Sequence, residues 1–406
     1  MDNNNRMDVR DFQLTRVPEA FLDDPYPWYA ALRERDPVHE LEGGGVFLSR
    51  YDDALAVYRD ARASSDKKVE FKPKFGDSPL YEHHTTSLVF NDPPLHTRVR
   101  RLIMGALNQR AIARMEADVV RLVDALLDAM EEKSEVDLIE DFAARIPVEV
   151  IGNLLDVPHA GRGPLRAWSI AILSGLEPKP TPQMLDAGNR AVVGFVSFLE
   201  KLIHERRRKP GDHESDVLTR LIQGEQDGEK LSAAELHHNC IFLLNAGHET
   251  TTNLIGNGLW LLLSHGDQLQ KLRNDISSTP VAVEEMLRYE GPIQLNNRRL
   301  TAPMTIGGHE LPEGTFITIG IGAANRDPHQ FPDAERFDVA RKPNRHIAFG
   351  QGDHACAGMN VARLEARIAL GRLLARFPRL EMTGQPRRDR RIRFRGLRNL
   401  PARAGV

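Results

Sequence analysis

The chain has 406 residues, of which 41% are hydrophobic, so it can bury a large core, and its length alone allows two or three domains. Its two cysteines exclude a disulfide scaffold, and its formal net charge of -3 argues against a general nucleic-acid-binding or membrane-coating protein. Residues 1–16 are polar and charged, and no apolar run reaches membrane-spanning length, which predicts a soluble, cytoplasmic protein.

Three short elements are predicted near the N-terminus: helices at residues 28–35 and 51–60, and a hairpin with strands 38–41 and 46–49 around Gly43–Gly45. The next stretch, residues 64–91, contains lysines and prolines and is predicted to be irregular. Irregular stretches of that length inside a compact domain tend to be functional.

A basic helix is predicted from His96 to Leu107, directly after a Pro-Pro pair. His96 and Arg100 lie four residues apart, so they share one helix face and can grip one anionic group. A solvated basic face is the alternative interpretation. Residues 111–208 are predicted to be helical with proline breaks, and they say little about chemistry.

A long buried helix is predicted to begin at Ser232 and to run to His265, a length of about 50 Å at ~1.5 Å per residue. Ser232 and Glu235 have the spacing of a capping box, and apolar residues lie almost all round the helix. Near its start, His237, His238 and Cys240 are an alternative metal site. Without a second ligand cluster, a polar first turn followed by a core cysteine is the preferred interpretation.

The middle of this helix, Ala246-Gly247-His248-Glu249-Thr250-Thr251, runs against helix propensity, and such local conflicts tend to mark function. Small Ala246 and Gly247 leave room for a flat cofactor and a diatomic ligand. Thr250 is placed to bond back to the Ala246 carbonyl and to open a groove. Glu249 is an ionisable residue in a helix predicted to be buried, so it needs a charged or hydrogen-bonding partner or has a functional role. A tolerated polar kink is the alternative.

Glu285 and Arg288 lie at positions i and i+3 of a later helix and are predicted to form an ion pair. Short strands are predicted after that helix at residues 298–301, 304–306 and 315–319, with glycine turns between them, and the basic stretch 387–398 is strand-like.

Cys356 follows two glycines and a histidine, and a third glycine and a predicted helix at 359–377 come after it. Free N–H groups and the positive end of the helix dipole favour a thiolate, and glycine lets the backbone approach whatever the sulfur holds. A single thiolate suits haem iron and suits zinc poorly. The alternatives are a structural cysteine in a turn and a G-x-G-x-x-A dinucleotide fingerprint, with a strand-like segment at 347–349 before it and Glu381 downstream.

Four patterns together resemble the cytochrome P-450 family. Residues 349–358, with the sequence Phe-Gly-Gln-Gly-Asp-His-Ala-Cys-Ala-Gly, are similar to its haem-binding loop, and residues 246–251 to its oxygen-activating motif. The remaining two are His96-x-x-x-Arg100, similar to the family's propionate-contacting helix, and Glu285-x-x-Arg288, similar to its structural pair, with Arg336 completing a trio. The resemblance covers nearly the whole chain and implies a mainly α fold, a single cytochrome P-450 domain over residues 1–406 with a small β-sheet region and a polar tail to about residue 16.

The resemblance also implies a cofactor, haem b (iron protoporphyrin IX), with Cys356 as the thiolate ligand of the metal. Thr250 would position the proton donor, and Glu249 would connect it to solvent. Arg298 is similar to a propionate-binding arginine, although the adjacent Arg299 leaves that assignment open by one residue. The other expected haem contacts are His96, Arg100, Ala246, Gly247, Phe349, His354 and Gly358.

Six residues fall where family members line the substrate pocket: Leu88, Val89, Asn245, Ile293, Gln294 and Leu397. Two of them, Asn245 and Gln294, are polar and indicate a ligand with a hydrogen-bonding group in an otherwise apolar cavity. Residues 165–198 would form a lid over this pocket.

The implied reaction is O2-dependent monooxygenation, in which one oxygen atom enters a small, largely apolar organic substrate by hydroxylation or a related oxidation. Electrons are expected from a separate ferredoxin or flavodoxin with its reductase, docked on Arg110, Lys342, Arg345 and Arg363. Two alternatives remain: a P-450-type peroxygenase, whose members typically lack the acid-threonine pair, and a non-catalytic haem sensor or electron carrier, which would not need that pair.

Overall fold

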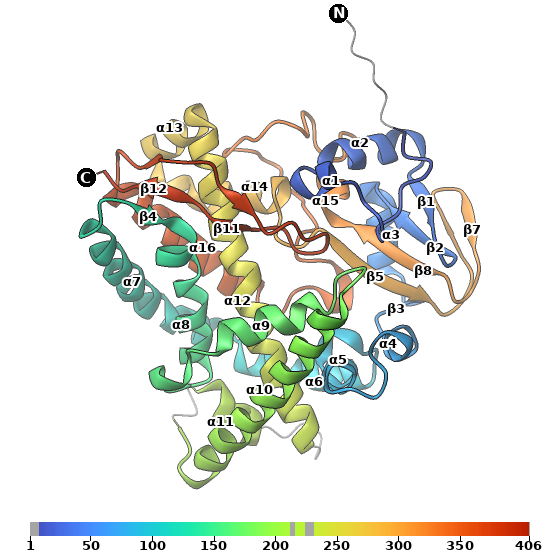
Figure 1. Ribbon diagram of the computed structural model, residues 1–406, viewed down its shortest axis with the longest axis horizontal. Helices are drawn as coiled ribbons and strands as arrows, with labels where there is room; N and C mark the ends of the chain where they lie inside the picture. Colours follow the sequence, from blue (N-terminus) through green and yellow to red (C-terminus); the bar gives the residue numbers. More distant parts are fainter. Residues whose placement is uncertain (1–7, 212–215, 224–230, 406) are drawn as a thin grey trace, which may run out of the picture. The chain divides into compact units, whose positions relative to one another are not determined.

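The computed structural model describes residues 8–211, 216–223 and 231–405 (Figure 1). The start of the predicted tail and parts of the polar stretch before Ser232 lie outside the described residues. The chain divides into two compact units. The first consists of residues 1–65, 257–356 and 386–398, and the second of residues 66–256, 357–385 and 399–406.

The first unit combines short helices with a mixed sheet, whose strand order is β1-β2-β8-β5-β3. Strands β2 and β8 are parallel, and the other neighbours are antiparallel. The predicted hairpin is confirmed as β1 and β2, with Val38 opposite Leu48 and with Gly43 and Gly44 at positive φ in the turn. The elements of this unit are α1 (Glu19–Asp23), α2 (Tyr26–Arg35), β1 (Val38–Leu41), β2 (Gly45–Leu48), α3 (Tyr51–Arg59), β3 (Ala63–Ser64), α13 (Gly266–Asn274), η4 (Ile276–Ser278), α14 (Thr279–Tyr289), β5 (Leu295–Leu300), β6 (Met304–Ile306), β7 (His309–Leu311), β8 (Phe316–Gly320), α15 (Ile321–Ala324), η5 (Gly352–His354) and β10 (Arg387–Arg388).

Residues 9–14 belong to the core of this unit rather than to a polar tail. Val9, Phe12 and Leu14 are buried, and the ring of Phe12 lies 5.5 Å from that of Phe21. The predicted tail is therefore too long, because three apolar side chains among charged residues are enough to anchor this segment.

The second unit is mainly helical, with one small antiparallel sheet in the order β4-β12-β9. The helix α12 begins in this unit, and its residues from Asn257 onward belong to the first. The elements are α4 (Lys68–Phe75), α5 (Pro79–Thr86), η1 (Leu88–Phe90), α6 (Leu95–Ala106), α7 (Gln109–Glu131), β4 (Val136–Asp137), the π-helix η2 (Leu138–Ala143), α8 (Arg145–Leu154), η3 (His159–Gly161), α9 (Leu165–Ser174), α10 (Pro182–Arg208), α11 (Val217–Gln223), α12 (Ala233–Ser264), α16 (Met359–Arg376), β9 (Glu381–Met382) and β12 (Pro401–Arg403), while β11 (Leu397–Asn399) ends where this unit resumes.

None of the described helices combines the length and the apolar character that crossing a membrane requires.

The stretch 64–91 is more regular than predicted, because α4, α5 and η1 occupy most of it. Ser78 caps α5, and Pro79 takes its first position, where a missing N–H costs nothing. The backbone N–H of Leu80 donates to the side-chain oxygen of Asn189 on α10 at 3.0 Å. The prediction of an irregular stretch was wrong because such short helices depend on packing and side-chain contacts distant in sequence.

The long buried helix is confirmed as α12, whose capping box forms as predicted. The Glu235 N–H donates to Ser232 Oγ at 3.2 Å, and the Ser232 N–H donates to Glu235 Oε2 at 2.8 Å. The helix ends at Ser264, and α13 begins at Gly266, so the sequence located both ends to within about one residue.

Helix α16 places the carboxyl group of Glu365 in the buried interior of the second unit. Glu365 is 3% exposed, and its carboxyl makes no hydrogen bond or ion pair within the described part of the chain. Burial raises the pKa of Glu365 well above its usual range. Ionising this side chain therefore costs more in the folded protein than in the unfolded chain.

We expect Glu365→Gln to stabilise the protein at alkaline pH. The folded pKa of Glu365 is raised, so its contribution to the free energy of unfolding falls as pH rises above about 4.5, and the substitution removes that loss. In urea titrations from about pH 4.5 to 8, the difference between the variant and the parent should grow with pH. The exposed control Glu313→Gln should show no such trend, and a pH-independent difference for Glu365→Gln would contradict the assignment.

Candidate functional site

Cys356 lies at the end of a glycine-rich loop in the first unit. Gly350 and Gly352 have φ angles of 66° and 69°, which glycine adopts without strain. A Cβ at Gly352 would lie 2.5 Å from the carbonyl oxygen of Tyr58, so a side chain there would force the loop away. The Cys356 N–H donates to the carbonyl of Phe349 at 2.8 Å and closes the loop. These contacts fix where the backbone presents the cysteine.

The two cysteines have different surroundings. Cys356 is half-buried, whereas Cys240 on α12 is fully buried. Burial, with a smaller contribution from the charge of Asp216, raises the pKa of the Cys240 thiol to about 12. Metal binding needs a deprotonated sulfur, so Cys240 is a poor ligand, as the preferred interpretation of the sequence had it. Its predicted partner His238 instead faces Glu82, with 3.6 Å between Nε2 and Oε1.

The dinucleotide-fingerprint alternative is not supported by the backbone. A fingerprint of that kind follows a strand of a parallel sheet and opens a helix. Residues 347–349 are not in a strand, and Gly352–His354 forms a single 3-10 turn. The sheet of this unit is largely antiparallel.

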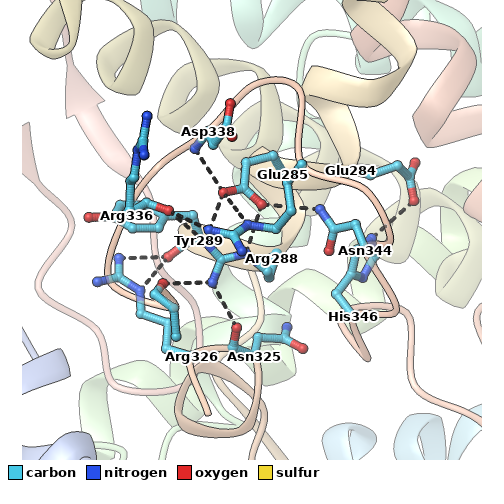
Figure 2. A network of polar contacts seen from close by, with 12 residues as sticks. Glu284, Glu285, Arg288, Tyr289, Asn325, Arg326, Arg336, Asp338, Asn344 and His346 are labelled. Carbon is cyan, nitrogen blue, oxygen red and sulfur yellow. Dashed lines mark hydrogen bonds and ion pairs between the residues drawn. The ribbon is translucent and has the colours of Figure 1, made fainter. Parts of the chain in front are cut away.

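Glu285 and Arg288 form the predicted ion pair on α14, and both side chains are 0% exposed (Figure 2). The pair is bidentate, with Arg288 Nε 2.7 Å from Glu285 Oε2 and Nη2 2.8 Å from Oε1. The guanidinium also donates to the carbonyls of Asn325, Ala334 and Arg336. The pair therefore ties α14 to the segment between α15 and the cysteine loop.

Arg336, the predicted third member of this group, does not place its guanidinium on Glu285. Its side chain is exposed, and it contributes its backbone carbonyl, which accepts from Arg288 at 3.1 Å (Figure 2). The guanidinium on the carboxylate is that of Arg341, with Nε 3.1 Å from Glu285 Oε1. The loop 333–341 turns back on itself, and this places Arg341, five positions after the predicted Arg336, against Glu285.

Two contacts that the sequence did not reveal hold the start of the cysteine loop. The side-chain oxygen of Asn325 accepts the backbone N–H of Ile347 at 2.8 Å. His346 lies 3.0 Å from Glu284 through Nε2, while its Nδ1 accepts the Ala348 N–H at 3.2 Å (Figure 2). Each contact joins segments 22 or 62 residues apart in sequence, and no local pattern predicts it.

A second buried network, also missed, surrounds Glu290. Burial alone would raise the pKa of this carboxyl, but Arg395, Arg388 and Arg326 outweigh burial and hold it at about 2. The guanidinium of Arg326 lies between two aromatic rings, 3.3 Å from the centre of the Tyr26 ring and 3.6 Å from that of Tyr289.

Arg298 lies on β5 and is buried, whereas the adjacent Arg299 is half-buried. Arg298 Nη1 donates to the carbonyl of Asn297 at 2.8 Å and to the side-chain oxygen of Asn296 at 3.1 Å, and its guanidinium lies over the Tyr58 ring. The arginine is thus held in a defined orientation on the sheet.

On α12, the Thr250 hydroxyl donates to the Ala246 carbonyl at 2.7 Å, which confirms the predicted bond. Thr252 makes the same kind of bond to His248 at 3.0 Å. Glu249, which directly precedes Thr250, is buried. A Cβ at Gly247 would lie 3.3 Å from the side chain of Ile151, so small size at this position lets α12 approach α8 closely.

The remaining predicted haem contacts lie on different elements. His96 is buried and Arg100 half-buried on α6, while the neighbouring Arg98 forms an ion pair with Glu235 at the start of α12. His354 is half-buried on η5. Gly358 precedes α16, and a Cβ there would meet no atom within 4 Å.

The predicted pocket residues fall into both units. Leu88 is buried on η1, and its N–H donates to the side chain of Asn239 on α12 at 2.8 Å, while Val89 is half-buried. Asn245, also on α12, is 2% exposed, and neither its amide oxygen nor its nitrogen has a partner in the described structure.

In the first unit, Ile293 bridges to Phe394, and Leu397 is buried on β11. Gln294 donates through Nε2 to the carbonyl of Gly291 at 2.8 Å, and its side chain packs against Gly322. Its amide nitrogen thus has an internal partner, so Gln294 is a weaker candidate for ligand recognition than Asn245.

Comparisons with known proteins identify the family. The model of the cytochrome P450 family matches residues 176–280 and 277–402. Cytochrome P450 107B1 of Saccharopolyspora erythraea is 39% identical, with 97% of this chain and 98% of that protein covered. The 6-deoxyerythronolide B hydroxylase of the same organism is 37% identical, with 96% and 99% covered. The chain therefore belongs to the cytochrome P450 family.

A solved structure of P450BioI, in complex with an acyl carrier protein ligated to hexadec-9Z-enoic acid, matches with a TM-score of 0.90. It is 34% identical, with 95% of this chain and 100% of that chain covered. This similarity confirms the predicted mainly helical cytochrome P450 fold. The chain is accordingly an oxidoreductase of the monooxygenase class, whose family uses haem with a thiolate ligand, organic substrates and redox partners.

The two arginines near Glu285 should differ sharply on substitution. We expect Arg341→Ala to lower the free energy of unfolding by about 2–4 kcal/mol, because it leaves a buried carboxylate short of one charged donor. Arg336→Ala should change it by less than about 0.5 kcal/mol, since that side chain is exposed and its carbonyl remains. Urea unfolding of both variants measures the difference, and equal losses would contradict the distinction between the two arginines.

Proposed function

We propose that this chain is a haem b monooxygenase in which Cys356 provides the iron ligand and Thr250 with Glu249 delivers protons. The observation that carries the proposal is the Thr250–Ala246 hydrogen bond beside a buried carboxyl group in the middle of α12. Burying a glutamate costs stability, and such a cost is retained where it serves a reaction.

The residues around the cysteine fit a haem. Cys356 is the half-buried thiol, on a loop that only glycines at 350 and 352 permit, while the other cysteine is a neutral core residue. At Gly358 neither packing nor a positive φ requires glycine, so we assign its lack of a side chain to close approach by the cofactor. When bound, the haem supplies O2 activation, which a thiolate ligand promotes.

The other proposed haem contacts are of two kinds. Ala246, Gly247 and Phe349 would pack against the porphyrin. His96, Arg100, Arg298 and His354 would bind the two propionates, which otherwise would be buried without compensating charge. The hydrogen bonds from Arg298 to Asn296 and Asn297 support this role. They already orient the guanidinium, which therefore loses little further freedom on binding a carboxylate.

The hydrogen bond of Thr250 defines how its hydroxyl can act. Its proton is directed to the Ala246 carbonyl, so the oxygen lone pairs remain free to accept a hydrogen bond from a water molecule. Thr250 would thereby hold a proton-donating water in position, and Glu249 would replenish the proton from solvent. Leu243, Leu244, Leu254 and Ile255, the buried apolar residues of α12 on either side of this motif, would help to exclude bulk water from this path.

The substrate we propose is a small, largely apolar molecule with at least one hydrogen-bonding group. Leu88, Val89, Ile293 and Leu397 would line the apolar part of its pocket, and Asn245 would pair with the polar group, with Gln294 in a lesser role. The named substrate of one relative, 6-deoxyerythronolide B, and the fatty acyl ligand of P450BioI fit that description. Screening such compounds for a shift in haem absorption would identify the class.

The electron donor we propose is a separate ferredoxin or flavodoxin with its reductase, acting in the cytoplasm. Arg110, Lys342 and Arg345 are exposed and Arg363 is half-exposed, so all four are available to an acidic partner. If the donor docks through these charges, the rate of electron transfer should fall as the salt concentration rises.

The ligand assignment is tested with the two cysteines as a matched pair. Cys356→Ser should abolish the spectral signature of a thiolate ligand in the reduced, carbon monoxide-treated protein, because a serine hydroxyl does not replace the thiolate. Cys240→Ala should keep that signature and lose only stability, by about 1 kcal/mol for the small cavity. Retention of the signature by Cys356→Ser would refute the assignment.

The proton-delivery role is tested with the two threonines that make the same bond. Thr250→Ala should bind haem and substrate normally yet divert most electrons to hydrogen peroxide, because the water that carries the proton is no longer held. Thr252→Ala, which removes the equivalent hydrogen bond two residues away, should leave the ratio of product to reductant unchanged. The role of Thr250 fails if both variants couple electrons to product equally well.

A further inference from the structure

Three histidines form a buried stack where α5 meets α12 in the second unit. His83 and His84 lie on α5, and His238 lies on the first turns of α12. The ring centres of His83 and His84 are 5.0 Å apart, and those of His83 and His238 are 5.6 Å apart. All three side chains are buried. The central ring, His83, therefore joins the two helices.

Two of the three rings have a nitrogen without a hydrogen-bond partner in the described part of the chain. Within the described residues, Nδ1 of His83 and Nδ1 of His238 make no hydrogen bond. Aromatic rings of α4 and η1 cover His84, with Phe71, Phe75 and Phe90 between 5.4 and 5.6 Å from its ring centre. Protonating one ring places a cation beside two other imidazoles in an apolar setting.

The charged neighbours come from every helix packed on the stack. Glu82 of α5 faces His238, and His237 lies beside it on α12. From α10, Glu200 and Arg207 act on His237, while Asp186 and Arg190 pair with each other. From α4, Lys72 lies over the Tyr81 ring and Lys74 over the Phe75 ring. Glu82, which contacts His238, is 64% exposed.

We propose that this histidine stack is an acid-sensitive latch that holds α5 on α12 at neutral pH and releases it on acidification. The latch goes beyond the reaction proposed above and does not depend on it. Its effect would pass to η1, since that turn follows α5 directly and Leu88 bonds Asn239 on α12. Acidification would therefore loosen the segment that carries Leu88 and Val89.

The direction of the effect follows from proton linkage. Burial, together with the neighbouring histidines, lowers the pKa of His83 well below 6.5, and burial lowers the pKa of His238. A released α5 exposes both rings, which then regain their ordinary pKa. The docked arrangement is therefore fully stable above about pH 6.5 and loses stability as pH falls below that value. For each histidine that titrates, the equilibrium constant for docking falls by up to about tenfold per pH unit.

Hydrogen–deuterium exchange of the purified holoprotein measures the latch. After correction for intrinsic exchange rates, amide protection in residues 79–86 should fall by about tenfold or more between about pH 7.5 and pH 5.5. Peptides from α7 should keep their protection over the same range and serve as the internal reference. Equal protection of α5 at both pH values would overturn the proposal.

Two substitutions separate a latch from simple packing. His83→Phe keeps a ring but removes one of the two titrating groups, so the pH response of α5 should fall to the part that His238 supplies, whereas His204→Gln at an exposed position of α10 should change nothing. Glu82→Gln is tolerated by folding because the side chain is exposed, and it should enlarge the response, since Glu82 favours the charged form of His238. A response unchanged in Glu82→Gln would overturn the proposal even if His83→Phe fails to fold.

Discussion

The buried Glu285–Arg288 pair is the interaction on which the architecture around the cysteine depends. Removing two charges from water costs several kcal/mol per ion, and only a fully satisfied environment compensates for that cost. The Glu285 carboxylate accepts hydrogen bonds from the side chains of Arg288, Arg341 and Asn344 and from the backbone N–H of Asp338. The guanidinium of Arg288 also donates to three backbone carbonyls. Because the partners outside the pair are spread along the segment 325–344, the pair holds that segment in one arrangement.

That arrangement continues into the cysteine loop. Asn325, whose carbonyl accepts from Arg288, uses its side chain to hold the N–H of Ile347, and His346 reaches back to Glu284 on the same helix as the pair. The backbone that precedes Cys356 is thus held by Asn325 and by Glu284 of α14 before the glycines turn it. A ligand held through a preformed loop of this kind loses little ordering entropy when it binds a metal.

The sequence predicted features that depend on neighbouring residues and missed those that depend on distant ones. The capping box of α12 and the Thr250–Ala246 bond each span three or four residues and were found from spacing. Residues 64–91 were assigned as irregular although α5 forms there, because that helix is stabilised by contacts with α10 and α12, which are distant in sequence. Arg336 was named from the family resemblance, and the contact of Arg341 with Glu285 was missed because the reversal of loop 333–341 is set by tertiary hydrogen bonds, which no local pattern encodes.

Two threonines on α12 show why a hydrogen bond alone does not define a functional group. The hydroxyl groups of Thr250 and Thr252 each donate to the backbone carbonyl four residues earlier, so both hydroxyls have a hydrogen-bond acceptor within the helix. Thr252 is buried, and its oxygen lies in packed surroundings, whereas Thr250 is partly accessible. Only an accessible oxygen can accept a hydrogen bond from a water molecule, so accessibility beside Glu249, rather than the bond itself, supports the role in proton transfer that we propose for Thr250.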